Sequence, residues 1–65
     1  MKILDFGTHK FMVVTGREAK VIFIHGLFDL YKINVISKTA TKITELKKLY
    51  KFAENGCIIG FEVGF

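Results

Sequence analysis

The sequence contains no proline, no tryptophan and a single cysteine, Cys57. One thiol excludes any disulfide within the chain, and the two histidines do not stand with it at the spacing of a structural metal site. A thiol that stays free is typical of a reducing compartment, so we expect a cytoplasmic protein.

Long apolar runs are also missing. The longest uncharged ones, 11–14 and 21–24, are four residues each, whereas a membrane span needs about 20. Near the N-terminus, Asp5 interrupts the chain before an apolar stretch could reach the length of a signal-peptide core. We therefore expect neither a membrane segment nor a targeting segment.

Apolar and basic side chains are abundant. Of the 65 residues, 51% are apolar and 25% are charged, which excludes a disordered chain and suits one small domain over residues 1–65. The formal net charge is +4, and nine of the ten basic residues are lysine, with Arg17 the tenth. Because a genome of low GC content supplies lysine in place of arginine whatever the function, the basic excess does not by itself indicate an anionic partner.

Glycines divide the first half of the chain into short apolar segments. Residues 2–6, 10–15 and 19–25 are rich in branched and aromatic side chains, which is typical of strands. The segments between them, 7–9 and 16–18, each contain a glycine that can adopt a positive φ angle. The pattern predicts three strands joined by two hairpin turns.

The second half predicts a strand, a helix and a last strand. Residues 31–36 alternate between apolar and polar side chains, as a strand with one solvated face does. Residues 41–55 predict an amphipathic helix, capped by Thr39 or Thr41 and ended by Gly56, whose apolar arc consists of Ile43, Leu46, Leu49, Tyr50 and Ala53.

The last predicted strand, 57–65, carries Cys57 and Phe65 on one apolar face. Ile58, Gly60, Glu62 and Gly64 lie on the other face. The two glycines leave that face nearly flat, so another side chain or backbone can approach closely there.

These elements predict an α+β fold, a small antiparallel sheet in ββββ-α-β order with one amphipathic helix packed on one face. Because 10–15 and 19–25 are apolar on both faces, one helix cannot cover all of their apolar surface. Either the sheet closes into a barrel or a second copy covers it, and we expect a homo-oligomer, a dimer or higher. The candidate self-association face consists of Met12, Val14, Ile22 and Ile24.

No catalytic or cofactor motif stands out. His9 and His25 could pair with a carboxylate or with Cys57, but no HxxxH or CxxC is present, and no carboxylate stands at helical or strand-ladder spacing from either histidine. The glycine-containing segments 16–20 and 26–28 lack the spacing of a phosphate-binding loop. A buried, inert Cys57 is expected, and we expect no metal, no cofactor and no enzymatic activity.

The outer face of the predicted helix is the clearest candidate surface. Proteins that bind single-stranded nucleic acids use lysines beside an exposed aromatic ring, because the lysines attract the phosphates and the ring stacks on a base. The alternative is a solvated helix face on which Glu45 and Glu54 offset the lysines. The candidate partner or nucleic-acid surface consists of Lys42, Lys47, Lys48, Lys51 and Phe52.

Three functions remain open. The first is a non-catalytic interaction or regulatory module that self-associates and binds another macromolecule, an unknown protein; accessory proteins of phages and other mobile elements are often chains of this kind. The second is a nucleic-acid-binding protein that uses the lysine-rich face. The third is an enzyme whose site is shared between subunits, with His25 and Asp29 as its candidates. We take the interaction module as the leading hypothesis.

Overall fold

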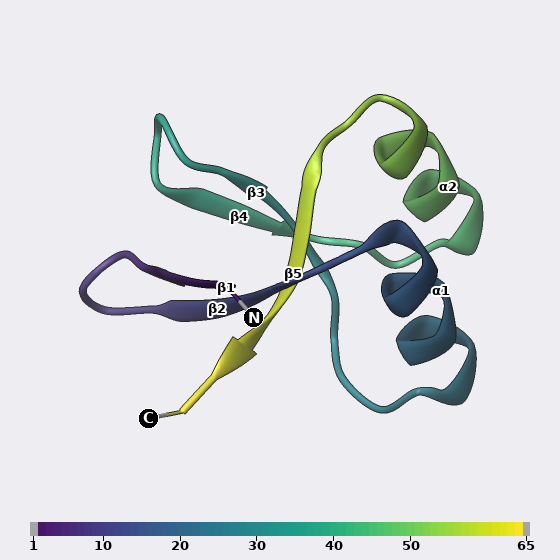
Figure 1. The fold of residues 1–65 in the computed structure, drawn as a ribbon, viewed down its shortest axis with the longest axis horizontal. Coiled ribbons are helices and arrows are strands. Elements are labelled where there is room, and N and C mark those ends of the chain that lie inside the picture. Colours follow the sequence, from purple (N-terminus) through teal and green to yellow (C-terminus); the bar gives the residue numbers. More distant parts are fainter. Residues whose placement is uncertain (1, 65) are drawn as a thin grey trace.

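The computed structural model describes residues 2–64, which form a five-stranded sheet and two helices (Figure 1). In chain order the elements are β1 (Lys2–Asp5), β2 (Lys10–Val14), α1 (Gly16–His25), β3 (Tyr31–Asn34), β4 (Thr39–Lys42), α2 (Leu46–Glu54) and β5 (Ile58–Val63). The strand order across the sheet is β1-β2-β5-β3-β4, and every neighbouring pair is antiparallel. The predicted α+β class with an antiparallel sheet is confirmed.

The first predicted hairpin is present. β1 and β2 pair from Lys2 opposite Val13 to Asp5 opposite Lys10. The turn is stabilised by the Gly7 amide, which donates to the Asp5 carboxylate at 2.8 Å, and Gly7 has a φ of +89°. That backbone angle is easily reached only without a side chain.

The strand predicted over 19–25 is wrong, because these residues belong to helix α1. Thr15 and Glu18 form a capping box: the Glu18 amide donates to the Thr15 hydroxyl at 3.1 Å, and the Thr15 amide donates to the Glu18 carboxylate at 2.9 Å. Gly26, in the left-handed conformation, ends the helix. The segment 16–18 therefore starts a helix and is not a hairpin turn.

The second helix is shorter than the sequence predicts. Residues 39–42 form β4 and pair with β3, so Thr39 and Thr41 lie in a strand and do not cap a helix. α2 begins at Leu46 with Glu45 at the N-cap position. Its end agrees with the prediction, since Gly56 has a φ of +74°.

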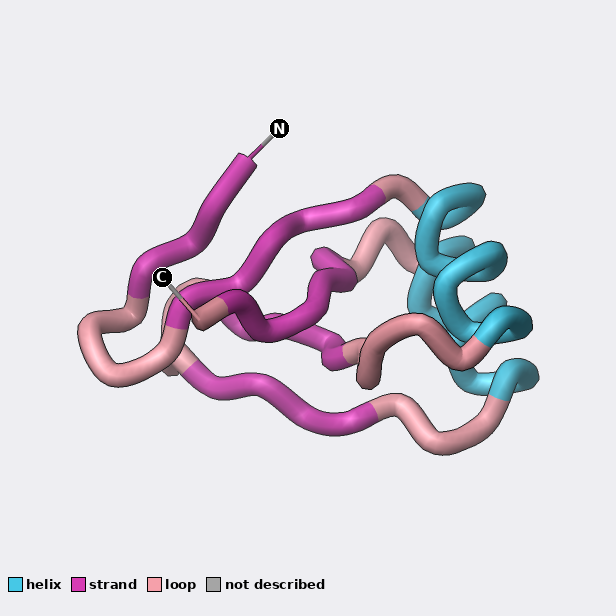
Figure 2. Tube along the Cα trace, turned by 90° about the horizontal axis from the view of Figure 1, so that it is seen from below, coloured by secondary structure: helices cyan, strands magenta, loops and turns pink. Residues whose placement is uncertain are grey.

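The two helices lie side by side on one side of the sheet, while the β1–β2 turn lies at the opposite end of the molecule (Figure 2). They enclose the main core with the helix-facing side of β5. Its buried members are Ala19, Leu30, Ile43, Leu49 and Ile59. Neither helix described between residues 2 and 64 has the length and apolar character that a membrane-spanning helix needs.

A second, smaller apolar layer lies on the other face of the sheet, around Gly60. Phe11 and Ile33 are buried there, with 4% and 5% of their surfaces exposed. A Cβ atom on Gly60 would stand 3.1 Å from Cδ1 of Ile33, so the close approach predicted for this glycine is confirmed. The sheet thus covers part of its own second face without a further subunit.

Candidate functional site

A hollow of about 220 Å³ opens on this second face, between the β1–β2 and β3–β4 hairpins. We call it the hairpin hollow. Its lining residues come from both hairpins and from β5, and they are Phe6, His9, Phe11, Tyr31, Lys38, Ala40 and Glu62.

Aromatic rings form much of the wall. Phe11 is buried, and its ring centroid lies 5.8 Å from that of Phe6 and 5.7 Å from that of Tyr31. β2 and β3, which carry Phe11 and Tyr31, are separated by β5. The two rings can meet because Gly60, opposite Tyr31 in the register, places no side chain between them.

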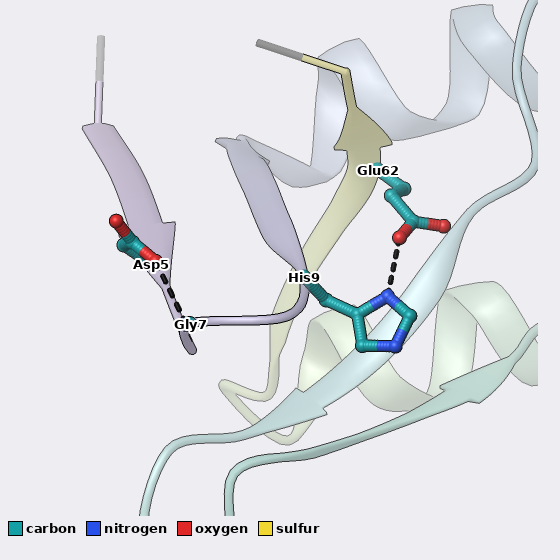
Figure 3. A network of polar contacts seen from close by, with 4 residues as sticks. All are labelled: Asp5, Gly7, His9 and Glu62. Atoms are coloured by element: carbon teal, nitrogen blue, oxygen red, sulfur yellow. Dashed lines mark hydrogen bonds and ion pairs between the residues drawn. The ribbon is translucent and has the colours of Figure 1, made fainter.

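The polar part of the hollow is a contact between His9 and Glu62. The His9 Nδ1 atom lies 2.5 Å from Oε2 of Glu62, and the second carboxylate oxygen points away from the imidazole ring (Figure 3). Both side chains reach solvent, with 60% and 44% of their surfaces exposed. The prediction that no carboxylate stands at strand-ladder distance from a histidine is therefore wrong for His9.

Glu62 is the residue that sequence reasoning missed. The alternation along the last strand correctly assigned it to the face of Gly60, but it could not show that β5 pairs with β2. That pairing, with Phe11 opposite Glu62, brings the carboxylate to a histidine 53 positions away. Only knowledge of the strand order could have revealed it.

Lys38 lies at the rim of the hollow in an unusual backbone conformation. The Asn34 side chain accepts hydrogen bonds from the amides of Ile36 and Ser37, at 3.0 and 3.1 Å, and so shapes the β3–β4 turn. Lys38 completes this turn with a φ of +57°, the one positive φ angle at a non-glycine residue among residues 2–64. A lysine there costs about 1 kcal/mol relative to glycine.

The five residues of the predicted nucleic-acid surface do not form one surface. Lys47, Lys48 and Lys51 are exposed on α2. Phe52, expected to be exposed, is half-buried against the main core, and the Nζ atom of Lys32 lies 4.9 Å from its ring centroid. It turns inward because α2 packs beside α1 on a shared core, so that more of the circumference of α2 is covered than one apolar arc.

Lys42 lies apart from the α2 lysines, at the end of β4. It forms an ion pair with Asp29, with 3.6 Å between Nζ and Oδ2. The helix residue that is exposed instead is Tyr50, which the sequence assigns to the apolar arc and which keeps 41% of its surface exposed.

The predicted self-association face is also divided, since it assumed that 19–25 was a strand. Val14 and Ile22 pack against the main core, and Met12 shares the helix-facing side of β2 with Val14. Ile24 alone of the predicted four is exposed, with 56% of its surface in solvent.

Ile24 belongs to a different group of exposed apolar side chains, on α1 and the residues that follow it. We call this group the α1 patch. Its members are Val21, Ile24, Leu27 and Phe28, which keep 48%, 56%, 59% and 54% of their surfaces exposed.

The other candidates for chemistry are not brought together. His25 is exposed at the end of α1, and Cys57 is half-buried. Asp29 pairs with Lys42 rather than with a histidine. Within the part of the chain that the structure describes, no three His, Cys, Asp or Glu side chains are grouped so that they could hold a metal ion.

Comparisons with protein-family models, with curated proteins and with solved structures find no match to this chain. Three features of the molecule remain as candidates for function: the hairpin hollow, the α2 lysines and the α1 patch.

Proposed function

We propose that this protein is a non-catalytic interaction module that self-associates through the α1 patch. The observation that supports it is the exposure of four large apolar side chains within eight residues, Val21 to Phe28, each keeping roughly half of its surface in solvent. Single exposed apolar residues are ordinary on protein surfaces, whereas several of them close together along one helix and the loop that follows it suit an interface.

The patch stands on a rigid support. The capping box fixes the start of α1. At its end, the Leu27 amide donates to the Ile22 carbonyl at 3.2 Å, and the Phe28 ring stacks on Phe61 with 4.5 Å between centroids. These contacts hold the α1 backbone and the Phe28 ring in place before any partner arrives, which lowers the entropy cost of binding.

A second copy of this chain is the partner that fits best. Two identical patches can meet about a two-fold axis, and the thin core of so small a domain is commonly supplemented by association. Burying a half-exposed side chain contributes about 1 kcal/mol, and association costs about 4 kcal/mol or more. Four side chains from each copy therefore predict a weak dimer whose population depends on concentration.

Paired substitutions test the proposal. Ile24→Asp places a charge in the α1 patch, and Ile36→Asp makes the same change at a side chain that is 95% exposed outside it. We expect the first variant to sediment as a monomer across the micromolar to millimolar range, and the second to dimerise as the wild type does. Circular dichroism melts should show both variants folded. A wild type that is monomeric throughout this range would contradict self-association.

Nucleic-acid binding is the second candidate, favoured by one observation. Lys47, Lys48 and Lys51 are all exposed on α2, and within residues 2–64 none of them forms an ion pair. Three free cations on one helix can neutralise three phosphates, which is a modest electrostatic surface.

Salt dependence tests this candidate. Affinity for a mixed-sequence single strand should fall linearly in log–log form with salt, with a slope of about −2 for three phosphates. The double variant Lys47→Glu, Lys48→Glu should lose binding and keep its melting temperature, whereas Lys20→Glu, a charge change on α1, should retain most of it. Binding that is undetectable at low salt would rule the candidate out.

A further inference from the structure

We propose that the hairpin hollow binds a nucleotide unit whose base carries an exocyclic amino group, with the base in the hollow and the phosphate at Lys38. This inference is independent of self-association, because the hollow and the α1 patch share no residue.

The size of the hollow limits its occupant to about one ring system. Pockets for drug-sized ligands measure about 300–1,000 Å³. The hairpin hollow, at about 220 Å³, is smaller than these and open to solvent. A flat base fits within it, while the sugar and phosphate would remain outside, at the rim.

The walls offer stacking surfaces. Phe6 and Tyr31 are half-buried on either side of the buried Phe11, so each keeps part of its ring accessible. Stacking of a base on an aromatic side chain contributes about 1–3 kcal/mol and tolerates any base, because every base has a π-face. The rings therefore favour any planar base and do not distinguish one base from another.

Selectivity comes from Glu62. An ionised carboxylate only accepts hydrogen bonds, and one of its oxygens is engaged by His9 Nδ1. The second oxygen points away from the imidazole (Figure 3) and can accept one N–H. An exocyclic amino group, as in adenine or cytosine, supplies that donor, whereas uracil presents carbonyl oxygens at the corresponding positions and would meet the carboxylate unfavourably.

Lys38 supplies the charge for the phosphate. It lies in the lining of the hollow and adopts the left-handed conformation that favours glycine. Strain of this kind is a pointer to function when the strained side chain faces a site. A lysine at that position gives the rim a cation close to the point where the sugar and phosphate of a bound nucleotide would leave the hollow.

The experiment is a titration of the 15N-labelled protein with AMP, followed by amide chemical shifts. We expect saturable shifts at Phe6, His9, Tyr31 and Lys38, with an affinity near the millimolar range. Adenosine, which lacks the phosphate, and UMP, which lacks the amino group, should each bind about fivefold more weakly.

Two variants separate the proposal from loss of folding. Lys38→Gly relieves the left-handed strain, so its melting temperature should hold or rise while AMP binds no better than adenosine. Glu62→Gln should abolish the preference for AMP over UMP. Lys47→Ala, on α2 and outside the hollow, is the matched control and should leave AMP binding unchanged.

A further experiment shows whether the bound nucleotide unit belongs to a nucleic-acid strand or is a free nucleotide. A short adenine-containing single strand that binds more tightly than AMP, and loses affinity on Lys38→Gly, identifies a strand as the source; equal affinity identifies the free nucleotide. The proposal is overturned if AMP moves no amide around the hollow at 10-fold its expected dissociation constant, about 10 mM. It is also overturned if folded Lys38→Gly and Glu62→Gln bind all the ligands as the wild type does.

Discussion

At the scale of single residues, Gly60 determines how the second face of the sheet packs. Its strand neighbours carry large side chains, and a Cβ atom at this position would lie 2.4 Å from the carbonyl oxygen of Met12 on the adjacent strand. Backbone cannot move aside as a flexible side chain can. The absence of a side chain therefore allows Phe11 and Tyr31 to meet in the wall of the hairpin hollow, and it leaves room for Ile33 close to the glycine.

Replacing Gly60 with alanine should therefore be strongly destabilising. We expect Gly60→Ala to cost about 3 kcal/mol, at the upper end of overpacking effects and a large part of the stability of so small a domain. Gly64→Ala is the matched control, since nothing lies within 4 Å of a Cβ atom there. Urea unfolding of both variants measures the difference, and equal midpoints would contradict the packing described around Gly60.

At the scale of elements, local signals were informative where one residue type forces one conformation. The β1–β2 hairpin and the end of α2 follow from Gly7 and Gly56, whose positive φ angles the structure confirms, and the last strand follows from its alternating side chains. The 19–25 segment failed because its branched apolar residues suit strands, whereas Thr15 and Glu18 form a capping box that starts a helix. Those two residues were visible in the sequence, and Ala19, Ile22 and Phe23 follow at helical spacing.

The candidate sites were harder to predict than the elements. The His9–Glu62 contact joins residues far apart in the chain through the pairing of β2 with β5, and no local pattern encodes that pairing. The exposure of Ile24 could be predicted only if residues 19–25 were assigned to a helix. Predicting the inward orientation of Phe52 requires knowing that two helices share one core, which the α2 sequence alone does not show.

The capping box predicts a pH dependence of stability. The pKa of Glu18 lies below its ordinary value of 4.5, first because its carboxylate accepts the backbone N–H of Thr15 and then because of the Thr15 side chain. A lowered pKa in the folded state means that the ionised carboxylate stabilises the fold above pH 4.5, and that this contribution is lost as the pH falls below 4.5 through the lowered pKa.

Glu18→Gln tests this dependence, because glutamine keeps a capping oxygen but does not titrate. The melting temperature of the wild type should exceed that of Glu18→Gln near neutral pH, and the gap should narrow as the solution is acidified below the ordinary pKa. Glu54→Gln, at the far end of α2, controls for the general loss of a negative charge. A gap for Glu18→Gln that does not change with pH would show that the capping box contributes nothing through its charge.

At the scale of the whole molecule, the large apolar side chains of residues 2–64 are divided between two layers, the α1 patch and four exposed residues elsewhere, Ile3, Val35, Ile36 and Tyr50. The helices and β5 enclose the main core, and the curled sheet covers the second face around Gly60. Association no longer follows from one helix having to cover two apolar sheet faces, because residues 19–25 belong to a second helix, α1, and not to a strand. What supports association now is the α1 patch, which neither layer covers.

Self-association through the α1 patch can be tested by a dilution series of the 15N-labelled wild type, from millimolar to low micromolar concentration. If two copies meet through the α1 patch, amide shifts should change with concentration at Val21, Ile24, Leu27 and Phe28, and stay constant along β1 and β4. A spectrum that does not change on dilution, or changes confined to the strand edges, would contradict the account.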